Sequence, residues 1–479
     1  MRLRQANRPF RRRLVRAGGW LAGVLVVAGC APVGPDYHRP AVSLPSTYPD
    51  EAVKREKVPL AGQDRWWTIY HDTQLDGLMQ KALADNLDLQ QAIARIEEAD
   101  ANMRIAGSAF LPEIDIGSTG SHSKVSTRNA NSQFIPQAVQ DKLHFALSTS
   151  FEIDFWGKFR RAREAARAEA LGSRYARDTV ELSMTSLIAD TYFTLRSLDV
   201  QIAVTESTLK SRSETLDLVR KQLASGIATD LDVNQAVDSE AAAASQLKSL
   251  TQQRALAAHQ IGLLTGHPGL MIAPSSGDVE TLPAPPIPPV GLPSSLLARR
   301  PDVREAEQSL IAANAQIGVA RAAMFPTISL TGNLGTESAE LATLLASGSE
   351  IWSIGYGLTL PIFDGGRLKA ATEIKVAQMK QALAAYQKSA QSAFREVADA
   401  LTTAETAAAQ EKDLATRVEA NTNALRIAQA RYRSGYSSFL EVLDAQRTLN
   451  EAQLAFINNR QTRLTANVDL IKALGGGWQ

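Results

Sequence analysis

The chain has 479 residues, of which 44% are hydrophobic and 21% are charged, and this is enough material for two or three ordinary domains. Its formal net charge is +1, and the first 29 residues contain seven arginines and no acidic residue. Without that segment the remaining chain carries a formal charge of −6. A mildly acidic chain gives no reason to expect a nucleic-acid partner.

Residues 1–29 have the pattern of a secretory signal peptide. The arginines are followed by an apolar run from Gly18 to Ala28. A helix needs about 20 apolar residues to cross a bilayer, and this run is only about half as long. A basic segment followed by a short apolar run is typical of a signal for export.

The single cysteine of the chain, Cys30, directly follows Val27-Ala28-Gly29. Small residues before a cysteine, preceded by an apolar run, resemble the lipobox of bacterial lipoproteins. In that signal the chain is cleaved before the cysteine, which then carries lipid, and two or more acyl chains give a nearly permanent anchor. We therefore expect 30–73 to be a lipid-anchored N-terminal segment with no thiol left for a disulfide or metal. A cysteine without such a role is the alternative.

The mature chain contains an internal repeat with a spacing of roughly 210 residues. The sequence FLPEI at 110–114 parallels FPTI at 325–328, and FWG at 155–157 parallels FDG at 363–365. A proline-rich connector at 283–296 separates the two copies. We expect repeats at 74–282 and 297–474, followed by a short tail at 475–479.

Each repeat is predicted to contain a helix, two strands, a very long helix and a further helix, in that order. The first repeat has a helix at 74–108, strands at about 112–122 and 143–155, and helices at 160–222 and 229–265. The second has a helix at 297–323, strands at about 326–335 and 351–363, and helices at 366–432 and 438–474.

The predicted strands alternate strictly between apolar and polar residues. From 143 to 155 the odd positions are apolar or aromatic, apart from Thr149, and the even positions are mostly polar. Such strands have one apolar and one polar face. At about 3.3 Å per residue and a tilt near 45°, they span roughly 25 Å, the height of the apolar band of an outer-membrane barrel. Trp156 and Trp352 lie near strand ends, where aromatic girdles occur. A half-buried sheet outside a membrane is the alternative.

Four strands cannot stand alone in lipid, because their open edges would leave backbone groups unpaired. The sheet must therefore close with copies from other chains. Two, three or four chains would give 8, 12 or 16 strands, and the sequence does not choose among these.

The long helices carry heptad patterns. Apolar residues between Leu195 and Leu223 recur at steps of three, four and seven, and mostly small residues do so between Leu383 and Ala404. This spacing is typical of a coiled coil. At 1.5 Å per residue each long helix reaches roughly 95–100 Å, about the length of the two shorter helices of its repeat placed end to end. We interpret this as the wall of a cylinder, with a coiled-coil rod as the alternative.

These features together resemble the outer membrane efflux protein (TolC-like) family, in particular the lipoproteins that serve resistance-nodulation-division pumps. The resemblance covers nearly all of the mature chain. Its motifs are Cys30 followed by GPDY at 34–37, WW at 66–67, SGIATDL at 225–231 and YRSGYSSFLEVLDAQ at 432–446.

The resemblance implies a homotrimer with a 12-stranded outer-membrane β-barrel, continued by a 12-helix periplasmic coiled-coil tunnel. The implied partners are outer-membrane lipid, a periplasmic adaptor (membrane fusion) protein and an inner-membrane resistance-nodulation-division transporter. The implied function is to conduct drugs or other small toxic compounds out of the cell. The outlet of a type I protein-secretion system and a periplasmic coiled-coil lipoprotein without a pore remain alternatives.

In this family the tunnel narrows at the periplasmic end, in the second helical hairpin. By position in the motif, Leu440 and Asp444 would point at the axis. Three copies of Asp444 would form a carboxylate ring that favours cations, and three copies of Leu440 an apolar collar. Arg447, one turn after Asp444, would hold the closed state through an ion pair. An ordinary surface pair is the alternative.

Two further sets of residues are candidates for functional roles. The hairpin tips around Gly226, Thr229, Gly435 and Ser438 are expected to contact the adaptor, and the two glycines to adopt the left-handed conformation that ends a helix. The acidic residues on the polar strand faces are expected to give the lumen a preference for cations, with solvated carboxylates of no selective role as the alternative. These are Glu113, Asp115, Glu152 and Asp154.

No enzymatic site is predicted. The six histidines are scattered, and no HExxH, P-loop or GxSxG motif is present. The sequence therefore implies no catalytic residues, no cofactor and no metal site.

Overall fold

The computed structural model describes residues 32–45, 48, 65–124, 139–278, 282–283, 285 and 296–476. The predicted signal peptide, Cys30 and most of the proline-rich connector lie outside these residues. The chain divides into two compact units. The first comprises Met1–Pro40, Glu97–Gly172 and Glu307–Ala385, and the second comprises Ala41–Ile96, Ser173–Ala306 and Tyr386–Gln479. Helices α3, α4, α7 and α8 contribute residues to both.

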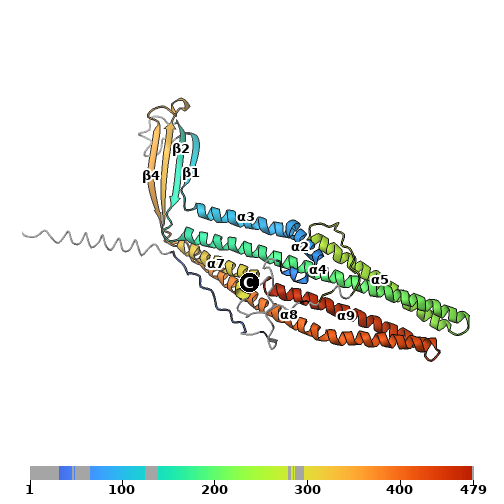
Figure 1. The fold of residues 1–479 in the computed structure, drawn as a ribbon. Helices are drawn as coiled ribbons and strands as arrows, with labels where there is room; N and C mark the ends of the chain where they lie inside the picture. Colours follow the sequence, from blue (N-terminus) through green and yellow to red (C-terminus); the bar gives the residue numbers. More distant parts are fainter. Residues whose placement is uncertain are drawn as a thin grey trace, which may run out of the picture. The chain divides into compact units, whose positions relative to one another are not determined.

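The first unit contains one antiparallel sheet with strand order β1-β2-β3-β4 (Figure 1). The strands are β1 (Glu113–Lys124), β2 (Val139–Glu152), β3 (Thr327–Ser338) and β4 (Glu350–Thr359). All four correspond to strands that the alternation predicts. The last strand ends earlier than expected because Pro361, within the predicted range, has no N–H to donate to a neighbouring strand.

The strand register places apolar side chains in rows that cross the whole sheet. Ile116 pairs with Leu147, Leu147 with Leu334, and Leu334 with Trp352. All four side chains are exposed, by 44% to 74%. Residues that pair directly lie on the same face, so this row defines one apolar face of the sheet that nothing within the described residues covers.

The opposite face of the sheet is polar. Asp115 pairs with Ser148, Ser148 with Asn333, and Asn333 with Ser353. This row lies one residue away from the apolar row, as the period of two along a strand requires. The two-faced character expected from the sequence is therefore present across all four strands.

The two outer strands of the sheet have open edges. Within the described residues, β1 pairs only with β2 and β4 only with β3. Every residue of β1 is exposed. The sheet does not close on itself within one chain, so the backbone groups along these edges are available to another strand.

The long helices are α4 (Lys158–Ala224) and α8 (Arg367–Arg433), each of 67 residues. Within the second unit the predicted heptad positions are inward-facing. Leu195 and Val219 of α4 are fully buried, as are Tyr386, Ala390 and Val397 of α8. Helix α5 (Asp230–Leu264) runs back along α4, and α9 (Phe439–Ala473) runs back along α8 (Figure 1).

The first helix of each repeat is interrupted where the sequence analysis expects one continuous helix. Asn86 separates α2 (Thr73–Asp85) from α3 (Leu87–Ser108), and its side-chain oxygen accepts a hydrogen bond from Leu89 N–H at 2.9 Å. This is an N-cap, which starts a new helix. Pro301 opens α7 (Pro301–Ala322) after the short α6 (Leu296–Arg299), because the residue before a proline is disfavoured in a helix.

Aromatic residues form much of the core of the second unit. Trp66 and Trp67 lie in a short 3-10 helix, η1 (Trp66–Tyr70), and are buried. Their rings meet edge to face with centroids 5.9 Å apart. Tyr70 packs on Phe193 and donates its hydroxyl to Asn467 Oδ1 at 2.6 Å. The WW motif is therefore a core element.

Within the part of the chain that the structure describes, no helix has both the length and the apolar character needed to cross a membrane.

Candidate functional site

The two helical hairpins of the second unit end in turns of the same construction. Gly226 follows α4 with φ +76°, and Gly435 follows α8 with φ +78°. In each turn a backbone N–H donates to a carbonyl in the last turn of the helix. Ile227 N–H donates to the backbone carbonyl of Gln222, and Tyr436 N–H to that of Arg431, both at 2.9 Å. This is the left-handed helix ending that glycine permits at little cost.

The residues that begin the returning helices differ. Thr229 forms a capping box at the start of α5: its hydroxyl accepts from Asp232 N–H at 3.2 Å, and its own N–H donates to Asp232 Oδ2 at 2.8 Å. Ser438 occupies the same position before α9 but makes no side-chain cap bond. Both residues are exposed. The α5 start is therefore more firmly fixed than the α9 start.

The ends of the two hairpins pack together through a small apolar cluster. It contains Leu216 and Val219 of α4 and Phe439 and Val442 of α9. Beside it, the hydroxyl of Tyr432 donates to Gln222 Oε1 at 2.6 Å and links the end of α8 to the end of α4. Sequence reasoning gave this link no role, although Tyr432 opens the hairpin motif that it singled out.

The three predicted gate residues lie together on α9. Leu440 is 61% exposed, a high value for leucine. Asp444 Oδ1 forms an ion pair with Arg447 Nη2 at 2.6 Å, and Arg447 Nη1 forms a second pair with Glu451 at 2.9 Å. Within one chain these are exposed pairs on a single helix, which contribute little to stability.

These residues line an open pocket of about 790 Å³ between α5 and α9. Arg212 of α4 also lines it, although that side chain is largely buried. Its Nη1 donates to the carbonyl of Ser239 at 2.7 Å, while its Nε has no hydrogen-bond partner within the described residues. Burial lowers the pKa of Arg212, opposed by the charge of Asp238. The pocket thus contains a second cation, which sequence reasoning missed because no local pattern marks it.

The predicted lumen carboxylates fall into two groups. Glu113 and Asp115 lie in β1 and are exposed. Glu152 is the last residue of β2 and pairs with Lys158 Nζ at 3.0 Å.

The placement of Asp154 on a strand face is wrong. The strand ends at Glu152, and Asp154 accepts from the N–H groups of Phe159 and Arg160 at 3.1 and 3.0 Å. It also pairs with Arg160 Nε at 3.2 Å. A carboxylate at the start of α4 satisfies N–H groups that have no partner within the helix, and this need outweighs continuation of the strand.

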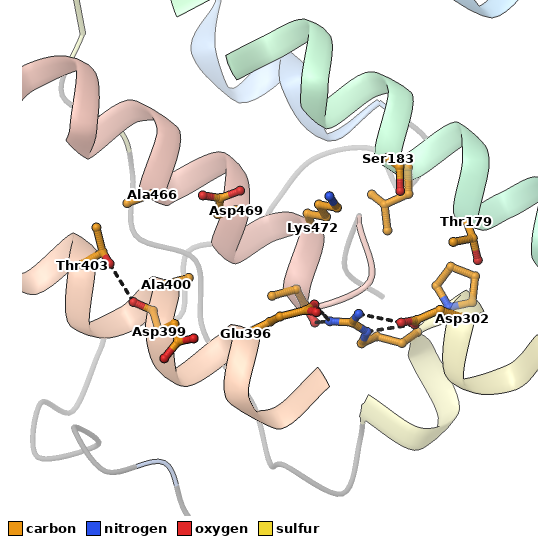
Figure 2. Close-up of a pocket in the computed structure, with 14 residues that line it drawn as sticks. Thr179, Ser183, Asp302, Glu396, Asp399, Ala400, Thr403, Ala466, Asp469 and Lys472 are labelled. Atoms are coloured by element: carbon orange, nitrogen blue, oxygen red, sulfur yellow. Dashed lines mark hydrogen bonds and ion pairs between the residues drawn. The ribbon is translucent and has the colours of Figure 1, made fainter. Parts of the chain in front are cut away.

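A second pocket of about 470 Å³ lies among α4, α8 and α9 in the same unit (Figure 2). Arg300 enters it and is held by Asp302 at 2.6 Å and Glu396 at 2.7 Å. Asp469 and Lys472 of α9 face the same space (Figure 2). Burial, together with the charge of Asp469, raises the pKa of Asp190 on α4 to about 8, while the charge of Lys472 opposes the shift. Asp190 is therefore protonated at neutral pH.

Comparison with known proteins identifies the family. The sequence matches the family described as "Outer membrane efflux protein" over residues 78–267 and 292–476, one match in each half. It is 35% identical to the toluene efflux pump outer membrane protein TtgC of Pseudomonas putida over 462 residues, 95% of this chain and 94% of that protein. It is also 35% identical to the outer membrane protein OprJ of Pseudomonas aeruginosa, covering 95% of each chain.

Solved structures agree with this result. The CmeC outer membrane channel of Campylobacter jejuni superposes with a TM-score of 0.85 at 27% identity, covering 94% of this chain and 96% of that one. Long helices and a four-stranded sheet in a chain of two matching halves are thus the fold of this family. The chain belongs to the outer membrane efflux protein family.

Proposed function

We propose that this protein is the outer-membrane channel of a tripartite efflux pump and that it works as a homotrimer. The observation that carries the proposal is the sheet with one apolar face, one polar face and two open edges. Three such sheets would close into a 12-stranded barrel, with the row from Ile116 to Trp352 toward lipid and the row from Asp115 to Ser353 toward water.

The helices would continue the channel into the periplasm. Each chain would supply α4 and α8 together with the shorter helices, so three chains would form a 12-helix tunnel. The tips around Gly226, Thr229, Gly435 and Ser438 are exposed and would contact a periplasmic adaptor protein. The adaptor would connect the tunnel to an inner-membrane resistance-nodulation-division transporter, which supplies the energy. The channel itself performs no chemistry.

The gate of the closed channel would lie at Leu440, Asp444 and Arg447. The exposure of Leu440 and Asp444 in one chain supports this assignment, because such side chains are free to meet their copies at a threefold axis. Three carboxylates in a ring would attract cations, and three leucines would exclude water from the passage. Arg447, bonded to both Asp444 and Glu451, would hold the ring in place.

The lumen would favour cations at the barrel end through Glu113 and Asp115, which are exposed on the polar face. Glu152 would contribute less, because Lys158 partly neutralises it. The lipid anchor would be attached at Cys30. Together with the barrel it would hold the protein in the outer membrane.

The cargo would be small toxic compounds such as solvents or antibiotics. Relatives that are 35% identical are named as a toluene efflux pump protein and an antibiotic efflux pump protein. These names favour efflux over the alternative of an outlet for protein secretion.

Conductance of the purified protein in planar bilayers tests the channel. Discrete conducting steps that favour cations are expected, because carboxylates line both ends of the passage. Deleting the gene should also make cells more sensitive to toluene, and the intact gene should restore resistance. Absence of any conductance from purified trimers, at all voltages and pH values, would reject the channel.

A further inference from the structure

Residues 32–40, which we call the strap, are docked on the first unit from their first residue. Val33 N–H donates to the carbonyl of Trp156 at 2.9 Å. Pro32 lies against Gly157, where an added Cβ would come within 2.6 Å of the proline Cβ. The strap therefore begins in close contact with the residues that join β2 to α4.

The strap backbone also lies on helix α7 at a contact between two glycines. A Cβ on Gly34 would lie 2.6 Å from the Cα of Gly318, and a Cβ on Gly318 would lie 2.7 Å from the carbonyl oxygen of Val33. One turn earlier on the helix, Asn314 Nδ2 donates to the carbonyl of Pro35 at 2.9 Å. A larger side chain at Gly318 would press on the strap and equally on the Arg161 side chain, whose Cγ lies 2.7 Å from the same Cβ position.

Two charged side chains on the helices beneath the strap form ion pairs with side chains of the strap. Arg161 of α4, whose side chain is only 6% exposed, donates to Asp36 at 2.6 Å, and this contact lowers the pKa of Asp36. Glu307 of α7, with a side chain 8% exposed, accepts from the Tyr37 hydroxyl at 3.0 Å and from Arg39 Nε at 2.6 Å. Removing the strap would take from Arg161 one of its two carboxylate partners, the other being Glu164 at 2.8 Å, and from Glu307 the Tyr37 and Arg39 donors. Loss of such partners is unfavourable for side chains that are largely buried.

We propose that the strap positions the lipid anchor, so that the acyl chains and the sheet enter the outer membrane at one level. The inference rests on the proposed function, in which Cys30 is acylated. Only Ala31 separates Cys30 from Pro32, and two peptide units reach about 7 Å. The anchor is thereby tethered beside the end of β2.

Aromatic rings mark the same end of the sheet as the level of a membrane interface. Trp156 stacks on Phe325 with ring centroids 4.6 Å apart, and Phe155 meets Trp156 edge to face at 4.8 Å. Trp156 Nε1 donates to the carbonyl of Pro326 at 2.8 Å. Tryptophan prefers the boundary between hydrocarbon and water, where the lipid of an anchored residue also begins.

Docking of the strap keeps the tether short. With the strap docked, two peptide units join Cys30 to the first docked residue, and with the strap released the tether grows to at least ten peptide units. The effective concentration of a tethered group falls with about the −3/2 power of the tether length. Release of the strap therefore lowers the effective concentration of the sheet at the lipid surface about tenfold. We expect the membrane-bound chain to assemble into trimers correspondingly more slowly.

The test uses the full-length protein synthesised in cells, with outer membranes isolated for the cleavage assay. Gly318→Ala inserts a methyl group against the Val33 carbonyl of the strap and against the Arg161 side chain that binds Asp36 of the strap. Gly172→Ala is the matched control, because its Cβ would meet only Gln308 at an ordinary 3.5 Å. Chymotrypsin cleavage after Tyr37 reports docking, chemical crosslinking after a pulse of synthesis reports the rate of trimer formation, and the mass of the N-terminal peptide reports acylation.

In the Gly318→Ala variant we expect the rate of cleavage at Tyr37 and the delay in trimer formation each to increase about tenfold. Acylation should be unchanged, and the Gly172→Ala control should behave like the wild type. Equal trimer formation in both variants would overturn the positioning role. So would rapid cleavage of the wild type at Tyr37. If Cys30 is not acylated but Tyr37 is still protected from cleavage, the proposed lipid anchor is wrong, while the docking of the strap is still supported.

A second variant covers the case in which Gly318→Ala does not fold. Asp36→Arg places a cation against Arg161 from an exposed position and leaves the helices unchanged. Asp413→Arg, at an exposed position of α8, is its control for charge. The same increase in cleavage and the same delay are expected for Asp36→Arg alone, and their absence would overturn the proposal.

Discussion

The hydroxyl of Tyr432 donates a hydrogen bond to Gln222 Oε1 over 2.6 Å, and this bond joins the ends of the two long helices at the tip of the second unit. It lies beside the apolar cluster around Val219 and Phe439. Any outward movement of one hairpin relative to the other must break it. The bond therefore favours the arrangement in which the tips lie together.

Removing this hydroxyl should ease separation of the hairpins. Tyr432→Phe deletes one partly buried hydrogen bond, worth about 1 kcal/mol, and leaves the ring in place against Phe439. We expect a higher open probability in planar bilayers, by about fivefold on this free energy. Tyr436→Phe, an exposed tyrosine in the adjacent turn, is the control. Identical single-channel records for both variants would contradict the role of the bond.

The proposed ring of Asp444 side chains predicts a specific change in conductance. Asp444→Ala removes the carboxylate and releases Arg447 from one of its two partners. We expect a severalfold increase in conductance and weaker block by divalent cations. Asp413→Ala, an exposed acid elsewhere on the same hairpin, should change neither. Unchanged conductance together with unchanged divalent block would reject Asp444 as a gate residue.

The two hairpin caps should respond differently to the same kind of substitution. Thr229→Ala removes a capping box, and loss of an N-cap costs about 1 kcal/mol. Ser438→Ala removes a hydroxyl that makes no cap bond. Hydrogen exchange in the first turn of α5 should therefore accelerate about fivefold, with little effect in the first turn of α9. Equal acceleration in both would show that the cap bonds do not determine local stability.

The buried carboxyl of Asp190 predicts that the fold loses stability toward alkaline pH. Its pKa is raised to about 8, so the native state holds a proton that the unfolded chain releases near pH 4. The contribution of Asp190 to the free energy of unfolding is therefore largest below about pH 4 and falls as the pH rises toward 8. Asp469 and Lys472 of α9 are the charged groups that act on Asp190, and Glu396 of α8 acts in turn on Asp469.

Asp190→Asn mimics the protonated form and should flatten this dependence. Thermal unfolding followed between pH 5 and pH 9 should give the variant a Tm at least about 3 °C above wild type at pH 8.5 and a smaller difference at pH 5. Asp217→Asn, an exposed acid on the same helix, is the control. A constant difference across the pH range would show that ionisation of Asp190 is not the cause.

The strands and the long helices follow from the sequence because both have a strict period. Alternation places Leu147 and Leu334 on one face, and heptads bury Leu195 and Val397, without any need for long-range information. The same rule failed at Asp154, where alternation continues past the end of the strand but the carboxylate caps a helix.

Other features depend on residues far apart in the chain. The strap meets Glu307 and Asn314 some 270 residues later, and Arg212 enters the pocket of Asp444 without any local motif. Such contacts carry no periodic pattern, so composition and spacing do not predict them. The family resemblance supplied the expected gate, but the hydrogen bonds of Tyr432 and Arg212 depend on how distant segments pack and follow from no motif.

The open edges of β1 and β4 present two different rows of backbone groups. In the proposed homotrimer the joint between copies would be head to tail, with β4 of one chain meeting β1 of the next. These two strands run in opposite directions, as an antiparallel pair requires. Head-to-tail joints close into a ring only when the rotation at each joint divides a full turn. In the proposed trimer the circumference of the barrel would thus be determined at a single repeated seam. A change in strand register at this seam would alter the diameter of the barrel without changing any contact inside the chain.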